Sequence, residues 1–426
     1  MRRTRTGVAL AGVVLSAHAC VSAPAPGGPP RPQDTPTTAD GRNRAGATIT
    51  NPSPMLPLAG DESLRRRMLD TVRLVLERAV ADSAFPGAFA VVGTRDGVIA
   101  SLGAGHLDWA PSPVPDEHTI WDLASLTKVV GTTTAVMQLV DAGRLALDAP
   151  VQRYLPQWTG RDKDRVTVRH LLTHSAGLPS WRPLHKESTS PEGALALVLA
   201  TELDTVPGAR MVYSDLGIVL LAQVVERVSG ERLDAYLARH VFEPLGMRET
   251  MYRPPAALRE RIAPTEWDPW RQRHLRGEVH DENAFALGGV AGHAGLFSSG
   301  HDLARFARMY LGGGALDGRR IVSEATIGSF TRVQDRALSH RALGWETPTG
   351  RNSAGTRLSD RAFGHTGFTG TSLWMDPGRD LFVLLLTNRV NPSRQNTRIS
   401  AVRVALADAA ASVLGAGTTT STPSGP

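Results

Sequence analysis

Apolar residues early in the chain first follow a helical period and then form short continuous runs. Residues 64–82 carry apolar side chains at helical spacing, which predicts a helix there. A Pro-Gly pair interrupts this pattern. Two apolar runs follow at residues 88–93 and 98–102, and the Asp-Gly turn between them predicts a pair of strands.

From Leu123 to about residue 310 the pattern is mostly helical. The clearest stripes lie over residues 129–140, 168–172 and 216–228, where apolar residues repeat at helical spacing. This long middle section predicts a mostly helical lobe over roughly residues 121–310.

Strands return only near the C-terminal end. Residues 363–374 predict a strand rich in Gly and Thr, and the apolar run at 381–386 predicts a buried strand. An amphipathic helix is expected over residues 398–414. Strands at both ends predict an α/β fold of the α+β kind, with one antiparallel sheet built from both chain ends, flanked by helices, and the helical lobe inserted. The cleft between lobe and sheet is the expected place for a site.

The first 20 residues have the three parts of a secretory signal. A basic start is followed by an apolar run at residues 7–15 and by small residues that lead to Cys20. This run is shorter than the ~20 residues that a membrane span needs. We therefore expect residues 1–19 to be a signal peptide, and the protein to be exported to the periplasm or cell envelope.

The position of the signal cut has two interpretations. Ala17 and Ala19 suit an ordinary signal peptidase, whereas Cys20, the one Cys of the chain, suits lipid attachment. Ala17 stands where a bacterial lipobox usually has Leu, which argues against lipid attachment. Cys20 is therefore a candidate lipid-attachment residue, and a lipoprotein anchored to the membrane through it is one of the two outcomes.

Composition and charge limit the remaining organisation and the partners. Residues 20–60, rich in Pro, Ala and Thr, predict a flexible tether, and residues 414–426 predict a disordered tail, which leaves a folded domain at 61–413.

The 47 basic residues include only 3 Lys and are dispersed among acidic residues, and the chain has a formal net charge of +6. A nucleic-acid groove needs a clustered basic face, so no nucleic-acid partner is expected. A single Cys excludes an intramolecular disulfide and a Cys-based metal site.

The segment Ser125-Leu-Thr-Lys128 is the first candidate for chemistry. If Ser125 opens a helix, Lys128 lies one turn later on the same face. A Ser hydroxyl is a poor nucleophile unless an adjacent base takes its proton. Lys can do so only if its pKa falls toward about 7–8. The spacing alone also fits a polar helix start.

Two further motifs follow in the chain. Tyr213-Ser-Asp215 lies between a Pro-Gly break and an apolar helix, where Ser or Asp would serve as a helix cap and the phenol could carry a proton beside Lys128. His365-Thr-Gly367 precedes a late strand, where small residues form a turn or let an edge strand approach a substrate closely.

The order of these three motifs resembles the penicillin-recognising serine enzymes. The chain is most similar to their branch of class C β-lactamases, D-alanyl-D-alanine carboxypeptidases, D-aminopeptidases and related esterases. Matching segments are Trp121–Lys128, Val168–Leu178 and Ala291–Ser298, and the resemblance covers about residues 61–412. It implies a serine hydrolase without a cofactor or metal that acts on a small-molecule or peptide substrate, peptidoglycan fragments included.

The resemblance also implies a role for each motif residue. Ser125 would be the acylated nucleophile, Lys128 its base or relay, and Tyr213 the carrier of the proton to the leaving group. The backbone N–H groups of Ser125 and Phe368 would form the oxyanion hole. The substrate-binding residues would be Asp215, His365, Thr366, Gly367 and His293.

Two positions depart from the family pattern. Asp215 stands where Asn is usual, and a carboxylate there could pair with Lys128 and raise its pKa, which favours Tyr213 as the proton acceptor. His365 stands where β-lactamases usually have Lys, and His is mostly neutral at pH 7. The second change weakens the β-lactamase interpretation and favours an esterase, amidase or peptidase.

Two weaker features have alternative interpretations. His170 and His174 stand four apart on a predicted helix, but no Glu follows His170 as a zinc protease would need, and we expect no metal site. The glycine-rich stretch at 280–295 suits either tight backbone packing or a wall of the substrate cleft that exposes His280 or His293.

Three hypotheses about function follow from these observations. The first is an exported serine hydrolase that cleaves an ester or amide, for example a cell-wall peptide or muropeptide, through an acyl-enzyme on Ser125. The second is a non-catalytic protein that binds or senses cell-wall fragments on the same fold. The third is a β-lactamase.

Overall fold

The computed structural model of this chain describes residues 56–350 and 352–416, which fall in one compact unit, Ser53–Pro426. The predicted signal peptide, Cys20, most of the tether and the end of the tail lie outside the described residues. Among the helices of the described part, none has both the length and the apolar character needed to cross a bilayer.

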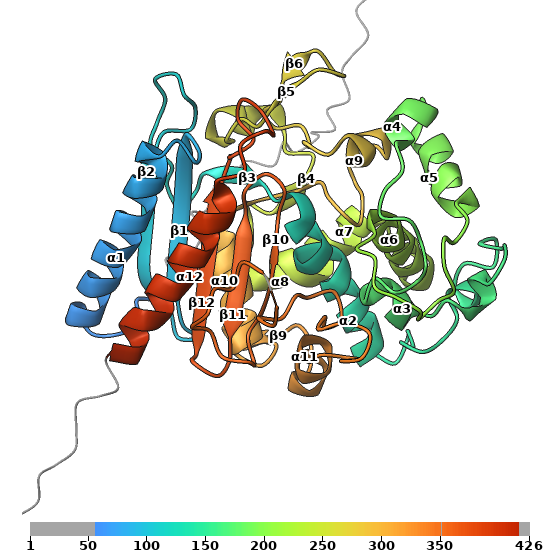
Figure 1. Cartoon of the computed structure of the whole chain (residues 1–426). Helices are drawn as coiled ribbons and strands as arrows, with labels where there is room; N and C mark the ends of the chain where they lie inside the picture. The colour runs from blue at the N-terminus through green and yellow to red at the C-terminus, as the bar shows by residue number, and fades with distance from the viewer. Residues whose placement is uncertain (1–55, 351, 417–426) are drawn as a thin grey trace, which may run out of the picture. The chain divides into compact units, whose positions relative to one another are not determined.

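Both ends of the chain build the largest sheet (Figure 1). Its strand order is β10-β11-β12-β1-β2, and all neighbouring strands are antiparallel. The strands are β1 (Gly87–Gly93), β2 (Val98–Gly105), β10 (Phe363–Thr366), β11 (Ser372–Asp376) and β12 (Leu381–Thr387). At the centre, Val91 of β1 lies opposite Leu384 of β12. The antiparallel sheet expected from both chain ends is therefore confirmed.

Helices cover both faces of this sheet (Figure 1). α1 (Glu62–Ala81) and α12 (Ile399–Ala416) pack on one face, and α10 (Gly300–Leu311) packs on the other. Successive side chains of a strand point to opposite faces. Accordingly, Leu385 belongs to the apolar cluster under α1 and α12, whereas Leu384 belongs to the cluster shared with α10.

The regular structure of the inserted section is mainly helical, as expected, and loops join its helices. Its α-helices are α2 (Thr134–Asp141), α3 (Val168–Leu172), α4 (Leu184–Glu187), α5 (Pro191–Ala200), α6 (Asp215–Ser229), α7 (Leu233–Leu237), α8 (Glu243–Leu245) and α9 (Glu282–Ala286), and α11 (Glu324–Thr331) follows α10. Shorter helical turns are η1 (Ala124–Leu126), η3 (Val151–Arg153), η4 (Lys163–Arg165) and η6 (Ala256–Arg261), with π-helical turns η2 (Lys128–Thr133) and η5 (Ala238–Phe242). η2 runs directly into α2, so the stripe over residues 129–140 covers two joined segments.

Short strands also occur in the lobe and were not expected from its pattern. β3 (Ile120–Asp122), β7 (Leu296–Ser299) and β4 (Met251–Tyr252) form a three-stranded sheet in that order. Two small hairpins pair β5 (Trp267–Asp268) with β6 (Arg273–His274), and β8 (Ala315–Leu316) with β9 (Arg319–Arg320). Such short strands hold too few positions for an alternating pattern to be recognised.

Three predicted boundaries need correction. Residues 57–59, placed in the tether, pair with the start of β2, since Val98 N donates to Pro57 O at 2.8 Å and Ala59 N to Val98 O at 2.8 Å. The strand expected over 363–374 is broken into β10 and β11 by a turn at 367–371. The last helix continues to Ala416, past the predicted end at 414.

Candidate active site

A strained turn after β3 holds Ser125. The preceding residue, Ala124, has a φ of +45°, in the left-handed region that L-residues rarely adopt. The buried Asp122 side chain supports this turn because its Oδ1 accepts from Ala124 N at 2.8 Å and its Oδ2 accepts from His280 N at 2.6 Å. Burial raises the pKa of Asp122, and these two backbone N–H groups oppose that rise. The turn therefore has a fixed geometry that presents Ser125.

Lys128 lies beneath Ser125 and is fully buried. Its Nζ donates to Ser125 Oγ at 2.8 Å and to His293 O at 3.0 Å, and it lies 2.8 Å from Asp215 Oδ1. Burial alone would lower the pKa of Lys128, but the Asp215 carboxylate and then Tyr213 raise it above its ordinary value. The predicted Lys128–Asp215 pair is thus present, and Lys128 is an ammonium that donates to Ser125.

Tyr213 lies beside the ammonium and is held by His174. The Tyr213 ring centroid is 5.1 Å from Lys128 Nζ and 4.5 Å from the His174 ring centroid. His174 O accepts from Val212 N at 2.8 Å, and His174 Nδ1 accepts from Ser214 N at 3.1 Å. His174 therefore contacts the residue on either side of Tyr213 and also packs on its ring. His174 itself has a φ of +56°.

The turn between β10 and β11 carries the third motif and is tied to the Ser125 turn. Thr369 Oγ1 donates to Asp122 O at 2.7 Å, and Thr371 Oγ1 donates to Leu123 O at 3.0 Å. A Cβ at Gly367 would lie 2.3 Å from Leu123 O, so only glycine fits this close approach. These contacts bring Phe368 to the same cavity as Ser125.

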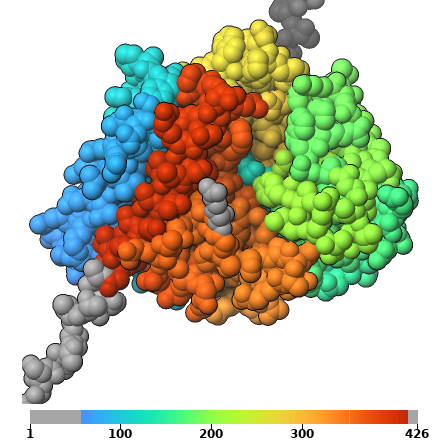
Figure 2. Space-filling view, viewed as in Figure 1, coloured from blue at the N-terminus to red at the C-terminus, as the bar shows by residue number. Residues whose placement is uncertain are grey.

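A cavity of about 460 Å³ opens above Ser125, within the size range of small-molecule sites. In Figure 2, teal atoms form the floor of a hollow bounded by the red C-terminal segment, the yellow segment that includes β5 and β6, and the green segment that includes α4 and α5. The predicted site residues that line it are Ser125, Tyr213, His365, Thr366, Gly367 and Phe368. Lys128, Asp215 and His293 lie behind this lining. The structure therefore gathers the predicted catalytic, oxyanion-hole and substrate-binding residues around one place, and their roles stay predictions. Cys20 lies outside the described residues.

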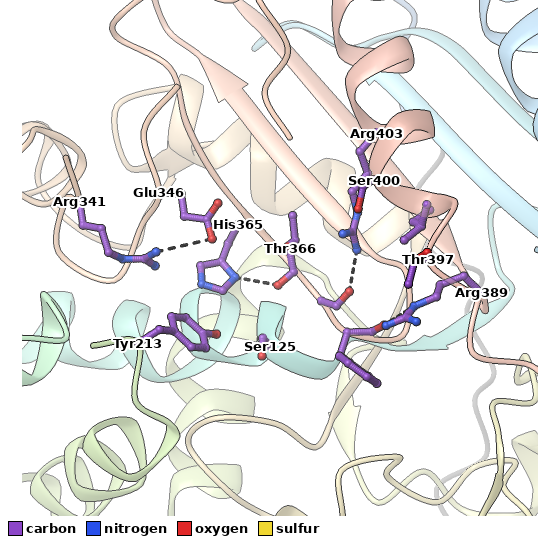
Figure 3. Close-up of a pocket in the computed structure, with 13 residues that line it drawn as sticks. Ser125, Tyr213, Arg341, Glu346, His365, Thr366, Arg389, Thr397, Ser400 and Arg403 are labelled. Atoms are coloured by element: carbon purple, nitrogen blue, oxygen red, sulfur yellow. Dashed lines mark hydrogen bonds and ion pairs between the residues drawn. The ribbon is translucent and has the colours of Figure 1, made fainter. Parts of the chain in front are cut away.

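His365 reaches the cavity as a neutral ring. It is buried, and its Nδ1 lies 2.8 Å from Thr366 O. Burial, followed by the charges of Arg341 and Lys128, lowers the pKa of His365 well below its ordinary value. The His365 ring centroid is 5.9 Å from that of Tyr213, and the two rings point toward each other across the cavity (Figure 3). Positive charge in the cavity must therefore come from other residues.

The cavity has a cationic lining that could not be recognised in the sequence. Arg341 reaches in beside Tyr213 and His365, and Arg403 of α12 lies at the opposite end (Figure 3). Arg341 is 3.5 Å from Glu346, and Arg403 Nη2 donates to Gly367 O and Thr371 O, each at 2.7 Å. Burial lowers the pKa of Arg403 to about 10, which leaves it charged at pH 7. No sequence signal singles out these residues, because arginines are dispersed along the whole chain.

Several buried nitrogen atoms of this lining, and of His174 behind Tyr213, have no hydrogen-bond partner among the described residues. They are Arg341 Nε, Arg341 Nη2, Arg403 Nε, His365 Nε2 and His174 Nε2. An unpaired buried polar group costs free energy, about 1–3 kcal/mol in mutational data. Arg341 and Arg403 line the cavity and hold unpaired donors, so they are candidates to bind a substrate. Nε2 of the neutral His365 ring is instead an acceptor, because Nδ1 donates to Thr366 O.

The expectation that His280 or His293 is exposed on a cleft wall is wrong. Both are buried, because each ring pairs with a carboxylate: His280 Nε2 is 2.8 Å from Glu266 Oε2, and His293 Nε2 is 3.0 Å from Asp281 Oδ1. His293 meets the site through its backbone carbonyl, which accepts from Lys128.

The histidine pair at 170 and 174 does not share a helix face. α3 ends at Leu172, and His174 follows it in a left-handed conformation. Asp215, Asp281 and His293 do place ligand atoms within 4.8 Å of one another. The Lys128 ammonium already supplies the positive charge for this group, through its ion pair with Asp215.

Comparison with known proteins agrees with this geometry. The profile of the beta-lactamase family matches residues 72–407, so the chain belongs to the beta-lactamase family. The resemblance seen in the sequence is confirmed, and the chain is a serine hydrolase of that family.

Two relatives have names that refer to cell-wall chemistry. The chain is 32% identical over 362 residues to the N-acetylmuramyl-L-alanine amidase of Bacillus subtilis (strain 168), an alignment that covers 76% of this chain and 81% of that protein. It is 30% identical over 317 residues to a Salmonella agona (strain SL483) protein that carries the provisional name D-alanyl-D-alanine carboxypeptidase, covering 66% of this chain and 72% of that protein.

Solved structures share the fold. A penicillin-binding protein homologue from Caulobacter crescentus superimposes with a TM-score of 0.67 at 24% identity, over 81% of this chain and 97% of that one. A variant of simvastatin synthase from Aspergillus terreus gives a TM-score of 0.65 at 19% identity, over 83% and 97% of the two chains. These likenesses confirm the predicted fold.

Proposed function

We propose that this chain hydrolyses an amide bond in peptidoglycan-derived peptides through an acyl-enzyme on Ser125. One observation carries the proposal: Ser125 Oγ, held 2.8 Å from the Lys128 ammonium, faces a cavity of about 460 Å³ that Tyr213 and the His365–Phe368 turn also line. A nucleophile, a proton carrier and candidate oxyanion donors thus surround one space, as acyl transfer requires.

The proton path follows from the charge on Lys128. Because its pKa is raised, Lys128 already holds its proton at pH 7 and donates to Ser125 Oγ, so it does not act as the first base. Tyr213 is then the proton relay in the cavity, because its phenol oxygen can take the Ser125 proton while its own O–H proton goes to the departing nitrogen. Oγ attacks the carbonyl carbon, Tyr213 passes the proton to the departing nitrogen, and the C–N bond breaks. Water then attacks the ester, and the acid leaves as Ser125 regains its proton.

The developing oxyanion would be bound by the backbone N–H groups of Ser125 and Phe368. The hydrogen bonds from Thr369 and Thr371 to residues 122 and 123 fix the two turns that carry these groups. Preorganised donors of this kind are worth about 10²–10³ in rate for each donor in other enzymes.

The unpaired donors of Arg341 favour a substrate with a carboxylate. Arg341 offers Nε and Nη2, neighbouring donors of one planar fork, and Glu346 lies 3.5 Å from its Nη1. Such a fork matches a carboxylate with two parallel hydrogen bonds. Cell-wall peptides carry carboxylates on their D-amino acids and at their C-terminus. Arg341 would therefore supply the charge that His365 does not provide.

The similarity to an amidase favours one bond over others. The Bacillus subtilis relative is named for the bond between N-acetylmuramic acid and L-alanine. On this chain the muramyl lactyl group would become the acyl group on Ser125, and the peptide would leave as an amine with its carboxylates toward Arg341. A D-alanyl-D-alanine bond is the alternative that the Salmonella relative suggests.

The first experiment treats the purified full chain with a fluorophosphonate probe and maps the adduct by mass spectrometry. We expect an adduct on Ser125 that is lost in Ser125→Ala. Ser400→Ala is the matched control, because Ser400 lines the same cavity and should leave labelling unchanged. Labelling that persists in Ser125→Ala overturns the proposed nucleophile, and a folded wild type without any adduct favours the non-catalytic binding protein.

The second experiment identifies the bond. The wild type is incubated separately with N-acetylmuramyl-L-alanyl-D-isoglutamine, with a peptide that ends in D-alanyl-D-alanine, and with nitrocefin, and products are separated by chromatography. Release of L-alanyl-D-isoglutamine supports the amidase proposal. Release of D-alanine alone replaces it with a carboxypeptidase, and rapid nitrocefin hydrolysis replaces it with a β-lactamase.

We also propose that the protein acts in the cell envelope after export. The support is the secretory pattern of residues 1–19 and the small residues before Cys20. Fractionation of cells that express the full chain and Cys20→Ser tests this. Membrane-bound wild type and released Cys20→Ser indicate a lipid anchor, whereas identical released fractions indicate simple cleavage. Retention of the full-length chain in the cytoplasm contradicts export.

A further inference from the structure

Two tryptophans stand exposed beside the active site. Trp181 is 47% exposed and Trp270 is 43% exposed, although Trp121, Trp158, Trp345 and Trp374 are fully buried. The His185 ring lies between the two exposed indoles, with centroid distances of 6.1 Å to Trp181 and 4.9 Å to Trp270. We call Trp181, His185 and Trp270 the aromatic ledge.

Packing and hydrogen bonds from α9 hold the side chains of the ledge in place. Trp270 meets Phe285 edge to face, with a centroid distance of 5.8 Å and an interplanar angle of 83°. Asn283 Oδ1 is 3.2 Å from His185 Nδ1, and Asn283 Nδ2 donates to Arg182 O at 2.7 Å. These two contacts join α4 and the segment just before it to α9. Side chains braced in this way lose little conformational entropy when a ligand binds.

The ledge continues directly from the catalytic group. Trp181 follows Ser180, whose carbonyl accepts from Asp215 N at 3.0 Å. On the other side, Phe285 belongs to α9, whose N-cap Asp281 pairs with the His293 that contacts Lys128 through its carbonyl. In Figure 2 the green and yellow segments that carry the ledge border the hollow above the teal floor. A substrate group bound at Ser125 can therefore extend in this direction onto the ledge.

Charged groups border the indoles. Arg271 lies with its guanidinium carbon 5.9 Å from the Trp270 ring centroid and 4.9 Å from that of Phe285. Beside Trp181, Arg182 pairs with Glu187 at 2.5 Å. Arg271 is buried and already paired with Asp268 and Glu278, whereas the Arg182 and Glu187 side chains stay 29% and 35% exposed. A wholly apolar occupant would desolvate the Arg182–Glu187 pair. An occupant with a flat C–H face and a polar edge suits both the indoles and their surroundings.

We propose that the aromatic ledge is a saccharide subsite that binds the pyranose ring on the acyl side of the substrate. The inference rests on the proposed function, because only a muramyl-type substrate places a sugar there. The C–H face of the ring would stack on Trp181 and Trp270, and its hydroxyls would face the charged border and water.

The test compares two substrates that differ only in the sugar. One is N-acetylmuramyl-L-alanyl-D-isoglutamine, and the other is N-lactoyl-L-alanyl-D-isoglutamine, which keeps the same scissile amide. In Trp181→Ala and Trp270→Ala, kcat/KM for the sugar-bearing substrate should fall roughly two- to tenfold per indole, while that for the lactoyl substrate stays unchanged. Trp109→Ala is the matched control, since Trp109 is 47% exposed on another loop. Equal losses on both substrates overturn the subsite.

A binding measurement separates this inference from the proposed function. Calorimetric titration of Ser125→Ala with N-acetylglucosaminyl-N-acetylmuramic acid needs no turnover. Binding that Trp270→Ala weakens supports the ledge even if no amide is cleaved. Amide cleavage by the wild type without measurable binding of this disaccharide, and without a sugar preference, overturns the ledge while the proposed function stands.

Discussion

The two sides of Ser125 differ in how their charges are compensated. On the buried side, Lys128 pairs with Asp215 at 2.8 Å, and His293 pairs with Asp281 at 3.0 Å. On the cavity side, Arg341 has one carboxylate at 3.5 Å and leaves two nitrogen atoms unpaired among the described residues. The buried side therefore holds its charged groups in close ion pairs, whereas the cavity side keeps unpaired donors on Arg341.

This difference separates catalysis from recognition in physical terms. A buried ammonium next to a carboxylate keeps its proton over the whole neutral range, so it gives Ser125 a constant electrostatic environment. Unpaired buried donors cost stability, about 1–3 kcal/mol for each group, until a ligand supplies the missing acceptor. Substitutions on the two sides should accordingly give different signatures, and four experiments can test this.

The largest effect is expected from Asp215→Asn, which removes the charge that compensates Lys128. Breaking a buried ion pair costs about 3–5 kcal/mol. Without Asp215, burial dominates and the Lys128 pKa falls below its ordinary value of 10.5, so the loss of stability should be greatest near pH 7 and shrink as the pH rises past 10. Urea unfolding at pH 7 and pH 10 measures this.

The matched control for that experiment is Asp148→Asn, which removes an exposed carboxylate bonded to Arg169 at 2.7 Å. Exposed pairs are worth about 0–1 kcal/mol, so this variant should unfold almost as the wild type does. A loss in Asp215→Asn that is no larger than in Asp148→Asn would contradict the account of the buried side.

The next effect is expected from Arg341→Met on the cavity side. Hydrogen bonds to charged groups contribute about 1.5–3 kcal/mol, so kcat/KM for a substrate with a carboxylate should fall by about 10- to 150-fold. For the same substrate with its carboxylate amidated, kcat/KM should be the same in Arg341→Met as in the wild type. Arg341→Lys keeps the charge without the fork and should fall between. Equal losses on both substrates would show that Arg341 has a structural role only.

A smaller effect is expected from His174, which holds Tyr213 from the side. His174→Ala removes the acceptor for Ser214 N and the ring against Tyr213, and we expect kcat to fall about tenfold with little change in KM, since one lost hydrogen bond is worth about 1 kcal/mol. His174→Asn keeps an acceptor near the Nδ1 position and tolerates a positive φ, so it should recover most of kcat. Equal activity of the two variants would exclude the positioning role.

The last effect is expected from acid and concerns stability rather than activity. Burial lowers the pKa values of His174 and His365 well below 6.5, so the unfolded chain takes up protons that the folded chain does not. The two neutral rings make their full contribution to the free energy of unfolding above pH 6.5. Below pH 6.5 this free energy falls by up to about 1.4 kcal/mol per pH unit for each ring. Urea unfolding between pH 7 and pH 5 should show a steeper decline in the wild type than in His365→Asn.

The strands and helices with strong patterns could be predicted, and those set by distant contacts could not. The apolar runs at 88–93 and 381–386 are β1 and β12, and the stripes at 64–82 and 216–228 are α1 and α6. β3 and β7 contain only three and four residues, and their pairing depends on contacts 170 residues or more apart in sequence, such as Trp121 with Ser298. No local pattern can show such a pairing.

The site shows the same limit. Ser125, Lys128 and Tyr213 could be singled out because residue type and order carry the chemistry. Arg341 could not, because one arginine among many shows its role only when the fold places it in the cavity. The exposure expected for His280 or His293 was wrong because the carboxylates that bury them, Glu266 and Asp281, become neighbours only in the folded chain.

The central position of β12 has a consequence for how the chain acquires its structure during synthesis. β1 lies between β12 and β2, so a nascent chain that ends before Leu381 holds only one of the two partners of β1. Pairings of such long sequence separation form slowly, because a long loop must close before they contribute. Almost the whole chain must therefore leave the ribosome before the sheet can close, and machinery that acts on the chain before closure has that interval in which to do so.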